Sequence, residues 1–196
     1  MAPKDSKTMP EFAYTLRIPK DRIAVVIGTK GAEKRKLEHA TGCKIEVDSK
    51  EGVVQIGGGE ALSLYVCREI VLAIGRGFSP EVAQLLLKQD YGVELLSIKD
   101  FAKNEGEMIR LKGRVIGEDG KSRRTIEELT GVHITVYGKT IGLIGELEML
   151  PLARKAVESL LSGQKHASVY KWLETRGKEL RKKQFLGDEW QKTQSR

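Results

Sequence analysis

The sequence predicts an α+β protein that contains two copies of one small unit, each with a three-stranded sheet packed on helices. Three observations predict this fold class. A seventeen-residue pattern occurs twice, 89 positions apart. Short segments near it alternate polar and apolar residues, as half-buried strands do. Longer segments carry apolar residues at helical spacing. The chain has 196 residues, a length that suits two small domains.

The repeated pattern has the same skeleton in both places. VIGTKGAEKRKLEHATG begins at Val26, and VIGEDGKSRRTIEELTG begins at Val115. In each copy two glycines stand three positions apart, an apolar residue follows six positions after the second glycine, and Thr-Gly closes the segment. The match continues further, because HITV in the second copy falls on KIEV in the first. We infer two copies of a domain of about 70–80 residues.

Within the first copy, each element follows from a local pattern. FAYTLRI alternates and predicts a strand. The charged segment after Gly31 predicts a helix that ends at Thr-Gly, because glycine readily takes the left-handed conformation. CKIEV and VVQIG predict two more strands, and residues 61–75 predict an amphipathic helix. The tripeptide SPE at 79–81 predicts the start of an extra helix, with a capping side chain, a proline and a carboxylate in its first turn.

These elements give the expected domain boundaries. We expect the first copy with its extra helix over residues 10–95, a linker over 96–106, and the second copy with its own extra helix over 107–185. Residues 186–196 are expected to be a disordered tail. The segment IAVVI at 23–27 is ambiguous, because its β-branched residues predict a strand by propensity alone.

The loop between the two glycines is a candidate phosphate site. Glycine permits positive φ and close approach of the backbone to a ligand. A loop that opens onto a helix N-terminus also offers unpaired N–H groups. A single G-x-x-G is equally compatible with a plain tight turn, but two copies before a basic helix start favour the phosphate site. GEDGKS at Gly117 does not match a nucleotide-binding P-loop, which needs four residues between its glycines rather than two.

Together, the apolar-Ile-Gly-x-x-Gly sequence, the apolar residue after it and the closing Thr-Gly resemble the KH RNA-binding module in both copies. The order strand, segment, G-x-x-G, helix, strand, strand, helix resembles the eukaryotic-type, or type I, KH arrangement. The resemblance implies that DRIAVVI, residues 21–27, is a short helix rather than a strand. It also implies that the loop clamps the backbone of about four unpaired nucleotides, while the bases lie in an adjacent apolar groove.

The resemblance assigns RNA contacts to the loops, to the basic residues after them and to one apolar residue of each groove. These residues are Gly28, Thr29, Lys30, Gly31, Lys34, Arg35 and Ile45 in the first copy, and Gly117, Glu118, Asp119, Gly120, Lys121, Arg123, Arg124 and Ile134 in the second. Many KH modules have an apolar residue where this chain has Lys34 and Arg123, so either the helix is rotated or these side chains reach toward a phosphate. Glu118 and Asp119 oppose a phosphate clamp, which leaves the strength of the second site open.

Over nearly the whole chain, the two KH copies and the later segment SGQKHASVYKWLE resemble the archaeal relatives of a small-ribosomal-subunit assembly factor, partner of Nob. The resemblance implies a protein without enzymatic activity that binds single-stranded small-subunit rRNA near its 3′ end during ribosome assembly. Ribosome-assembly or initiation proteins stay open as further partners. The alternative is a KH adaptor of an RNA-degrading complex or an mRNA regulator, and an enzyme such as a nucleotide hydrolase or nuclease is the competing class.

Composition limits the remaining classes. A net charge of +7 and a pI near 9.3 favour polyanionic partners. From Lys165 onward there are nine basic and four acidic residues, which form either an RNA-contacting arm or a solvated end. Cys43 and Cys67 match no zinc or redox spacing, so we expect buried thiols in a reducing compartment. No segment suits a signal peptide or a membrane span, which predicts a cytoplasmic protein. We expect no catalytic residue, metal, cofactor or small-molecule substrate.

Overall fold

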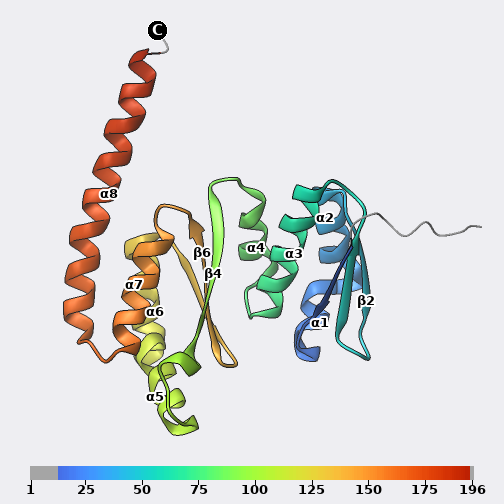
Figure 1. Cartoon of the computed structure of the whole chain (residues 1–196), viewed down its shortest axis with the longest axis horizontal. Coiled ribbons are helices and arrows are strands. Elements are labelled where there is room, and N and C mark those ends of the chain that lie inside the picture. The colour runs from blue at the N-terminus through green and yellow to red at the C-terminus, as the bar shows by residue number, and fades with distance from the viewer. Residues whose placement is uncertain (1–12, 195–196) are drawn as a thin grey trace, which may run out of the picture. The chain divides into compact units, whose positions relative to one another are not determined.

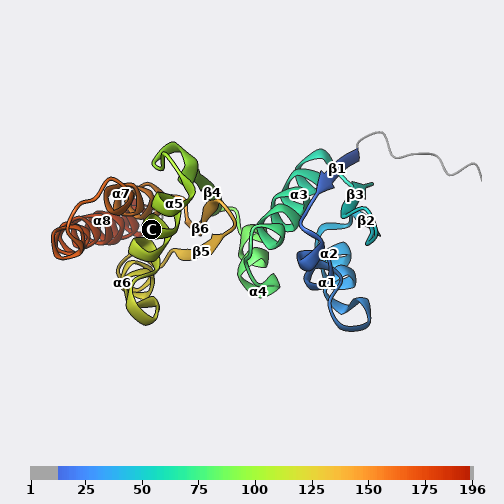
Figure 2. The same ribbon diagram turned by 90° about the horizontal axis from the view of Figure 1, so that it is seen from below.

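The computed structural model describes residues 13–194 and divides into two compact units, Met1–Leu87 and Lys88–Arg196. Each unit contains a three-stranded antiparallel sheet in which the last strand in sequence lies between the other two. Helices cover one face of each sheet (Figures 1 and 2). The predicted α+β class with two similar halves is therefore confirmed.

The first unit follows the predicted order of elements. Its strands are β1 (Ala13–Arg17), β2 (Lys44–Asp48) and β3 (Val53–Gly57), and its helices are α1 (Lys20–Ile27), α2 (Ala32–Thr41), α3 (Ala61–Gly75) and α4 (Pro80–Ala83). The central strand β3 pairs with both neighbours, so that Ile56 lies opposite Tyr14 on one side and Ile45 on the other. Ser79 caps α4 as predicted, because its Oγ accepts a hydrogen bond from Val82 N at 3.4 Å.

The second unit repeats this order of elements, with two longer strands and a much longer last helix. Its strands are β4 (Tyr91–Ser97), β5 (His133–Tyr137) and β6 (Thr140–Glu146), and its helices are α5 (Glu105–Ile116), α6 (Lys121–Thr130), α7 (Leu150–Leu161) and α8 (His166–Gln194). The central strand β6 pairs with β4 over seven residues and with β5 over five. Apolar side chains from the sheet and from all four helices form one core, which includes Leu111, Ile126, Leu143, Val157 and Leu173.

The ambiguous segment 23–27 is helical, as the KH resemblance implied, and lies within α1. Ile23 and Val26, three positions apart, are 4% and 1% exposed, whereas Ala24 between them is exposed. One face of the helix is therefore buried, and α1 packs on α2 and α3. Burial at helical spacing stabilises the helix more than the β propensity of these residues opposes it.

The Thr-Gly pairs end their helices in the same way in both units. Thr41 Oγ1 donates to Leu37 O at 2.8 Å and accepts from Cys43 N at 3.3 Å. Thr130 makes both equivalent bonds, at 2.7 and 3.2 Å. The glycine that follows each threonine has φ near +70°, 68° in the first unit and 73° in the second. The buried hydroxyl thus joins the last helical turn to the chain that enters the next strand.

Two predicted boundaries differ from the structure. Residues 91–95, placed in the first copy, belong to β4, and the expected linker 96–106 contains the end of β4 and the start of α5. β4 belongs to the second unit because it hydrogen-bonds to β6 along its whole length. The expected disordered tail also differs, because α8 continues to Gln194 and only residues 195–196 lie outside the described part. No helix within residues 13–194 is long and apolar enough to cross a membrane.

Candidate nucleic-acid interface

The two G-x-x-G loops have nearly identical backbone conformations. Gly28 and Gly117 have φ/ψ of 70°/176° and 75°/173°, and Gly31 N donates to Gly28 O at 3.1 Å, as Gly120 N does to Gly117 O at 3.2 Å. Each loop is a single tight turn of 3₁₀ type between two helices. A glycine stands at the N-cap of α2 and of α6, and glycine has no side chain with which to cap the first N–H groups. The first of these N–H groups is bonded within the loop, Ala32 N to Thr29 O and Lys121 N to Glu118 O, so an anion would meet the positive end of the helix dipole and the N–H groups of the following positions.

The third residue of each loop is left-handed although it is not glycine. Lys30 has φ 52° and ψ 28°, and Asp119 has φ 49° and ψ 27°. A residue with a Cβ atom is less stable in this region by about 1–2 kcal/mol, and aspartate tolerates it better than lysine does. The turn therefore holds both side chains in a conformation that they rarely adopt, and both side chains are exposed.

The first glycine of each loop is required by the helix that follows. A Cβ atom added at Gly28 would lie 2.7 Å from Glu33 Cγ, and one added at Gly117 would lie 2.6 Å from Ser122 Cβ. Any other residue at either position would force the helix away from the loop. The close approach thus fixes the start of α2 and of α6 against the turn.

An arginine lies over the second glycine in both units. A Cβ atom added at Gly31 would lie 3.1 Å from Arg35 Nη1, and one added at Gly120 would lie 3.4 Å from Arg124 Nη1. Both arginines are four positions beyond their glycine, one turn into the helix, and both are exposed. A guanidinium, a tight glycine turn and the positive end of a helix therefore converge at each loop, which is the chemistry that binds a phosphate group.

Lys34 and Arg123 do not extend toward the loops. Lys34 Nζ lies 3.7 Å from Glu38 Oε1, and Arg123 Nε lies 3.7 Å from Glu127 Oε2. The same two carboxylates accept the backbone N–H of the strand that follows, at 2.9 Å from Ile45 and 2.7 Å from Ile134. Each of the two basic residues therefore lies beside a carboxylate that joins the helix to the next strand by a hydrogen bond.

The two apolar groove residues are core residues. Ile45 is 0% exposed and Ile134 is 4% exposed, so neither side chain offers a surface to a base in this structure. β2 and β5 turn these side chains toward the helices, and a direct contact of either residue with RNA stays a prediction. Ile116, which directly precedes the second loop, is 37% exposed and is an accessible apolar residue there.

The charges of the two loops differ. Thr29 and Lys30 occupy the first loop, and Glu118 and Asp119 occupy the second; all four are exposed. Basic residues follow both loops, at Lys34 and Arg35 in the first unit and at Lys121, Arg123 and Arg124 in the second. Lys121 is the first residue of α6, whereas the first residue of α2 is an alanine. Lys121 therefore adds one positive charge beside the acidic second loop.

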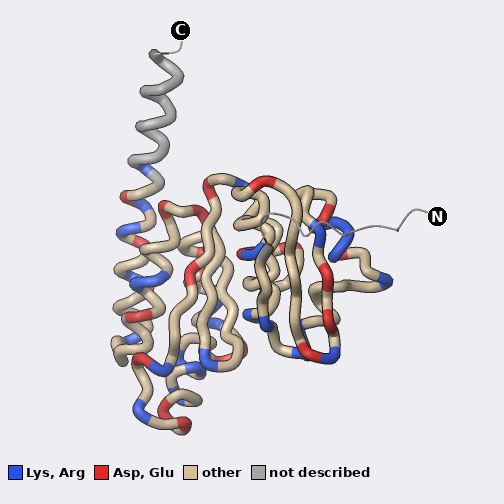
Figure 3. Tube along the Cα trace, turned by 45° about the vertical axis from the view of Figure 1, so that its right-hand side comes forward, with Lys and Arg blue, Asp and Glu red and all other residues tan. Residues whose placement is uncertain are grey.

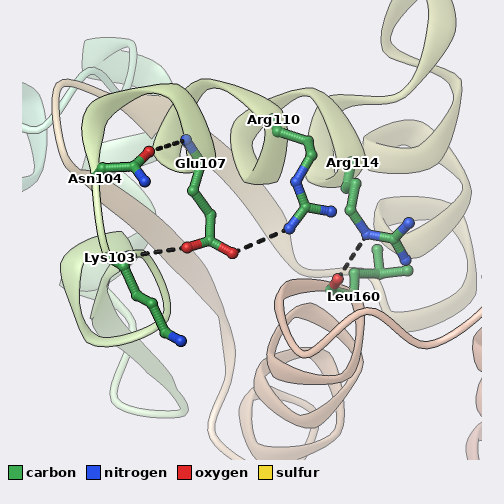
Figure 4. Close-up of polar contacts among 6 residues, drawn as sticks. All are labelled: Lys103, Asn104, Glu107, Arg110, Arg114 and Leu160. Carbon is green, nitrogen blue, oxygen red and sulfur yellow. Dashed lines mark hydrogen bonds and ion pairs between the residues drawn. The ribbon is translucent and has the colours of Figure 1, made fainter.

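Each helix that precedes a loop is anchored by an arginine. Arg114 Nε donates to Leu160 O at 2.9 Å, and its Nη2 donates to Gln164 O (Figure 4). His166 Nε2 in turn donates to Arg114 O at 2.8 Å. Arg22 acts likewise in the first unit, with Nε bonded to Ile74 O at 2.8 Å. The other end of α5 is capped by Asn104 and Glu107, and the N–H of Lys103 is the main reason that the pKa of Glu107 is lowered.

Sequence reasoning missed the anchoring arginines and the carboxylates Glu38 and Glu127. A signal for the carboxylates was present, because Glu127 lies 89 positions after Glu38 and the repeat therefore holds a glutamate at the same place in both copies. The arginines gave no such signal. Within residues 13–194, no group of three or more His, Cys, Asp and Glu side chains could hold a metal ion.

Comparison with known proteins agrees with this geometry. Residues 92–178 match the family model of the eukaryotic-type KH domain, KH-domain type I, and residues 13–73 match the KH domain model. A KH domain-containing protein of Methanocaldococcus jannaschii is 45% identical over 174 residues, which cover 87% of this chain and 76% of that protein. The pre-rRNA-processing protein PNO1 of Phaeosphaeria nodorum is 34% identical over 109 residues, 55% of this chain but only 42% of that protein.

Two solved structures from Pyrococcus horikoshii are also similar. One is the crystal structure of Dim2p, with 41% identity, a TM-score of 0.79, and coverage of 84% of this chain and 99% of that chain. The other is a chain from the a/eIF2alpha–aDim2p–rRNA complex, with 42% identity, a TM-score of 0.80, and coverage of 86% and 95%. The matches span both units and both loops. The chain therefore belongs to the archaeal Dim2/PNO1 family of tandem KH-domain proteins.

Proposed function

We propose that this protein binds single-stranded small-subunit rRNA, near its 3′ end, during ribosome assembly, and that it does so as a clamp without enzymatic activity. The observation that carries the proposal is the repeated convergence of an arginine guanidinium, a helix N-terminus and a tight glycine turn, at Arg35 in the first unit and at Arg124 in the second. Relatives named as pre-rRNA-processing proteins, and a related chain in a complex that contains rRNA, support the choice of RNA.

In the proposed mechanism, each loop holds backbone phosphates and no bond is made or broken. The amides at the starts of α2 and α6 donate to phosphate oxygens, and Arg35 and Arg124 add charge-assisted hydrogen bonds. The bases lie beside the loop, where Ile116 offers an exposed apolar surface in the second unit. An a/eIF2α-type initiation protein is a proposed partner, because the related complex contains one.

A salt titration with a short single-stranded RNA tests the clamp. If each unit contacts two or three phosphates, the slope of log K against log salt should be about −3 to −4. A duplex of the same sequence should compete poorly, because its bases are not open to the groove. A slope near zero would contradict the proposal.

Two further measurements separate the proposal from its competitors. Incubation with ATP, GTP and end-labelled RNA should give binding and no turnover, whereas hydrolysis or cleavage would assign the protein to the enzyme class. Crosslinking in the native cell, followed by sequencing of the bound RNA, should recover small-subunit rRNA. Crosslinks confined to messenger RNA would favour the regulatory alternative.

A further inference from the structure

The outward face of α8 carries a stripe of positive charge. Its members are spaced three or four positions apart, so they share one side of the helix, and all are exposed: Ser168, Lys171, Thr175, Lys178 and Lys182. The stripe covers fourteen residue steps, a length of about 21 Å. It contains no acidic and no large apolar residue.

The opposite face of α8 is buried against its own unit. Val169 and Leu173 are 2% and 0% exposed, and α8 packs on α6 and α7. At Gly177, α8 lies near α6, and an added Cβ atom would be in ordinary van der Waals contact with Leu129 O at 3.5 Å. Because the packed face is fixed in this way, the lysine stripe points away from the core and into solvent.

The lysines of the stripe make no close ion pair with any side chain that the structure describes, although Glu174 and Glu179 lie on the same helix three or four positions from them. Among the described side chains, Lys171, Lys178 and Lys182 take part in no ion pair of 4.0 Å or less. Arg176, which lies off the stripe, does pair with Glu179, at 2.8 Å. Lysines and arginines recur along the described part of α8 in Figure 3.

The stripe begins close to the second loop. His166, the first residue of α8, bonds to Arg114 O, and Arg114 is three positions before Gly117. A strand held at the second loop therefore has the start of α8 beside it. The first unit has no counterpart, because a four-residue helix, α4, and a 3₁₀ turn follow α3 there.

We propose that the α8 stripe is an additional RNA contact that binds the phosphate backbone of a strand extending beyond the second loop. The inference rests on the proposed RNA-binding function. Three exposed cations in a row, none of them in a close ion pair with a described side chain, suit a polyanion. A protein partner is less well matched, because protein interfaces depend on apolar and aromatic anchors, which the stripe lacks.

The test compares two single-stranded RNAs on the full chain. A strand of roughly 5 nucleotides fills one groove, which takes about four nucleotides, and one of roughly 30 nucleotides also reaches the stripe. The test variant is Lys171→Gln/Lys178→Gln/Lys182→Gln, because glutamine and lysine have similar helix propensity. The control variant removes the same charge from exposed lysines of the same unit, as Lys99→Gln/Lys103→Gln/Lys155→Gln.

We expect the stripe variant to bind the long RNA at least tenfold more weakly than the control variant, with a salt slope shallower by about 2, or 0.7 for each lost phosphate contact. Its affinity for the short RNA should equal that of the control. Equal affinities of the two variants for the long RNA would overturn the inference and leave an acidic protein surface as the candidate partner. An equal loss for both RNAs would overturn it too, since the lysines would then act only through net charge. Failure of the unaltered protein to bind either RNA would instead remove the proposed function itself.

Discussion

Arg114 donates a hydrogen bond from Nε to the carbonyl oxygen of Leu160, 46 positions further along the chain, and so ties the helix before the second loop to the end of α7 (Figure 4). Arg114→Met should lower the free energy of unfolding of the second unit by about 1–3 kcal/mol, because the variant loses charge-assisted bonds to carbonyl groups. Arg110→Met is the matched control. Arg110 is exposed and pairs with Glu107 within one helix turn, so its loss should matter by less than about 0.5 kcal/mol.

Urea titration with tryptophan fluorescence can measure this difference selectively. Both tryptophans, Trp172 and Trp190, belong to the second unit, so the signal reports the unfolding of that unit. Equal midpoints for the two variants would mean that the Arg114 bonds add nothing to stability.

The two glycines Gly117 and Gly131 separate steric clash from backbone strain. Both have positive φ, 75° and 73°, but an added Cβ meets Ser122 at 2.6 Å in the first case and nothing within 4 Å in the second. Gly131→Ala should therefore destabilise the second unit by about 1–2 kcal/mol through strain alone. Gly117→Ala should cost the same strain energy and about 1–3 kcal/mol more, because its Cβ atom overlaps Ser122. The same fluorescence titration measures both, and similar losses would argue against the close approach of α6 to the loop.

Replacing Lys30 by glycine should raise the stability of the first unit and lower its affinity for RNA. Lys30→Gly relieves the left-handed strain and should stabilise the first unit by up to about 1 kcal/mol, whereas Lys30→Ala keeps the strain and should change stability little. Both variants remove the same charge, so both should weaken RNA binding by a similar amount, at most about 1 kcal/mol of binding free energy. Both cysteines lie in the first unit, so thiol labelling in urea can follow its unfolding. A glycine variant less stable than the alanine variant would contradict the strain argument.

The acidic residues of the second loop should limit its affinity. Glu118→Lys/Asp119→Lys should strengthen binding of a short single-stranded RNA by about tenfold or more, since each exposed charge matters by roughly 1 kcal/mol or less and 1.4 kcal/mol is tenfold. Thr29→Asp/Lys30→Asp should weaken it by a comparable factor. Neither change should move the thermal midpoint much, because lysine and aspartate both already occupy the left-handed position. Weaker binding after the Glu118/Asp119 reversal would show that these carboxylates make specific contacts.

Cys67 should be unreactive while the first unit is folded. Burial raises the pKa of its thiol to about 12, and the residue is 0% exposed. The thiolate is the reactive form, so a thiol reagent at pH 8 should label Cys67 only after unfolding. The raised pKa also means that the folded state retains the proton longer, so stability should fall as the pH rises from the unfolded pKa near 9 toward about 12. Rapid labelling of Cys67 in the native protein would contradict this.

Patterns that are local in sequence predicted much of the fold and of the site. The glycine loops, the Thr-Gly helix ends and the Ser79 cap depend on backbone conformations that few residues adopt, and for that reason they were recognisable. β4 was missed because Leu95 and Leu96 are both apolar, so the strand lacks the alternation that marks a half-buried strand. The left-handed Lys30 and the bonds of Arg114 depend on tertiary packing, and no residue spacing encodes them.

Arg22 and Arg114 make equivalent contacts from positions that the 89-residue offset between the two halves does not superpose. A residue-by-residue alignment of the two halves sets Arg114 against Val25 and Arg22 against Leu111. The two arginines therefore lie one helical turn apart in the repeat, yet each bonds to a carbonyl oxygen near the end of the corresponding helix, Ile74 O in α3 and Leu160 O in α7. The same tie between two helices is thus made from either of two neighbouring turns, so the position of the arginine can differ while the contact is kept.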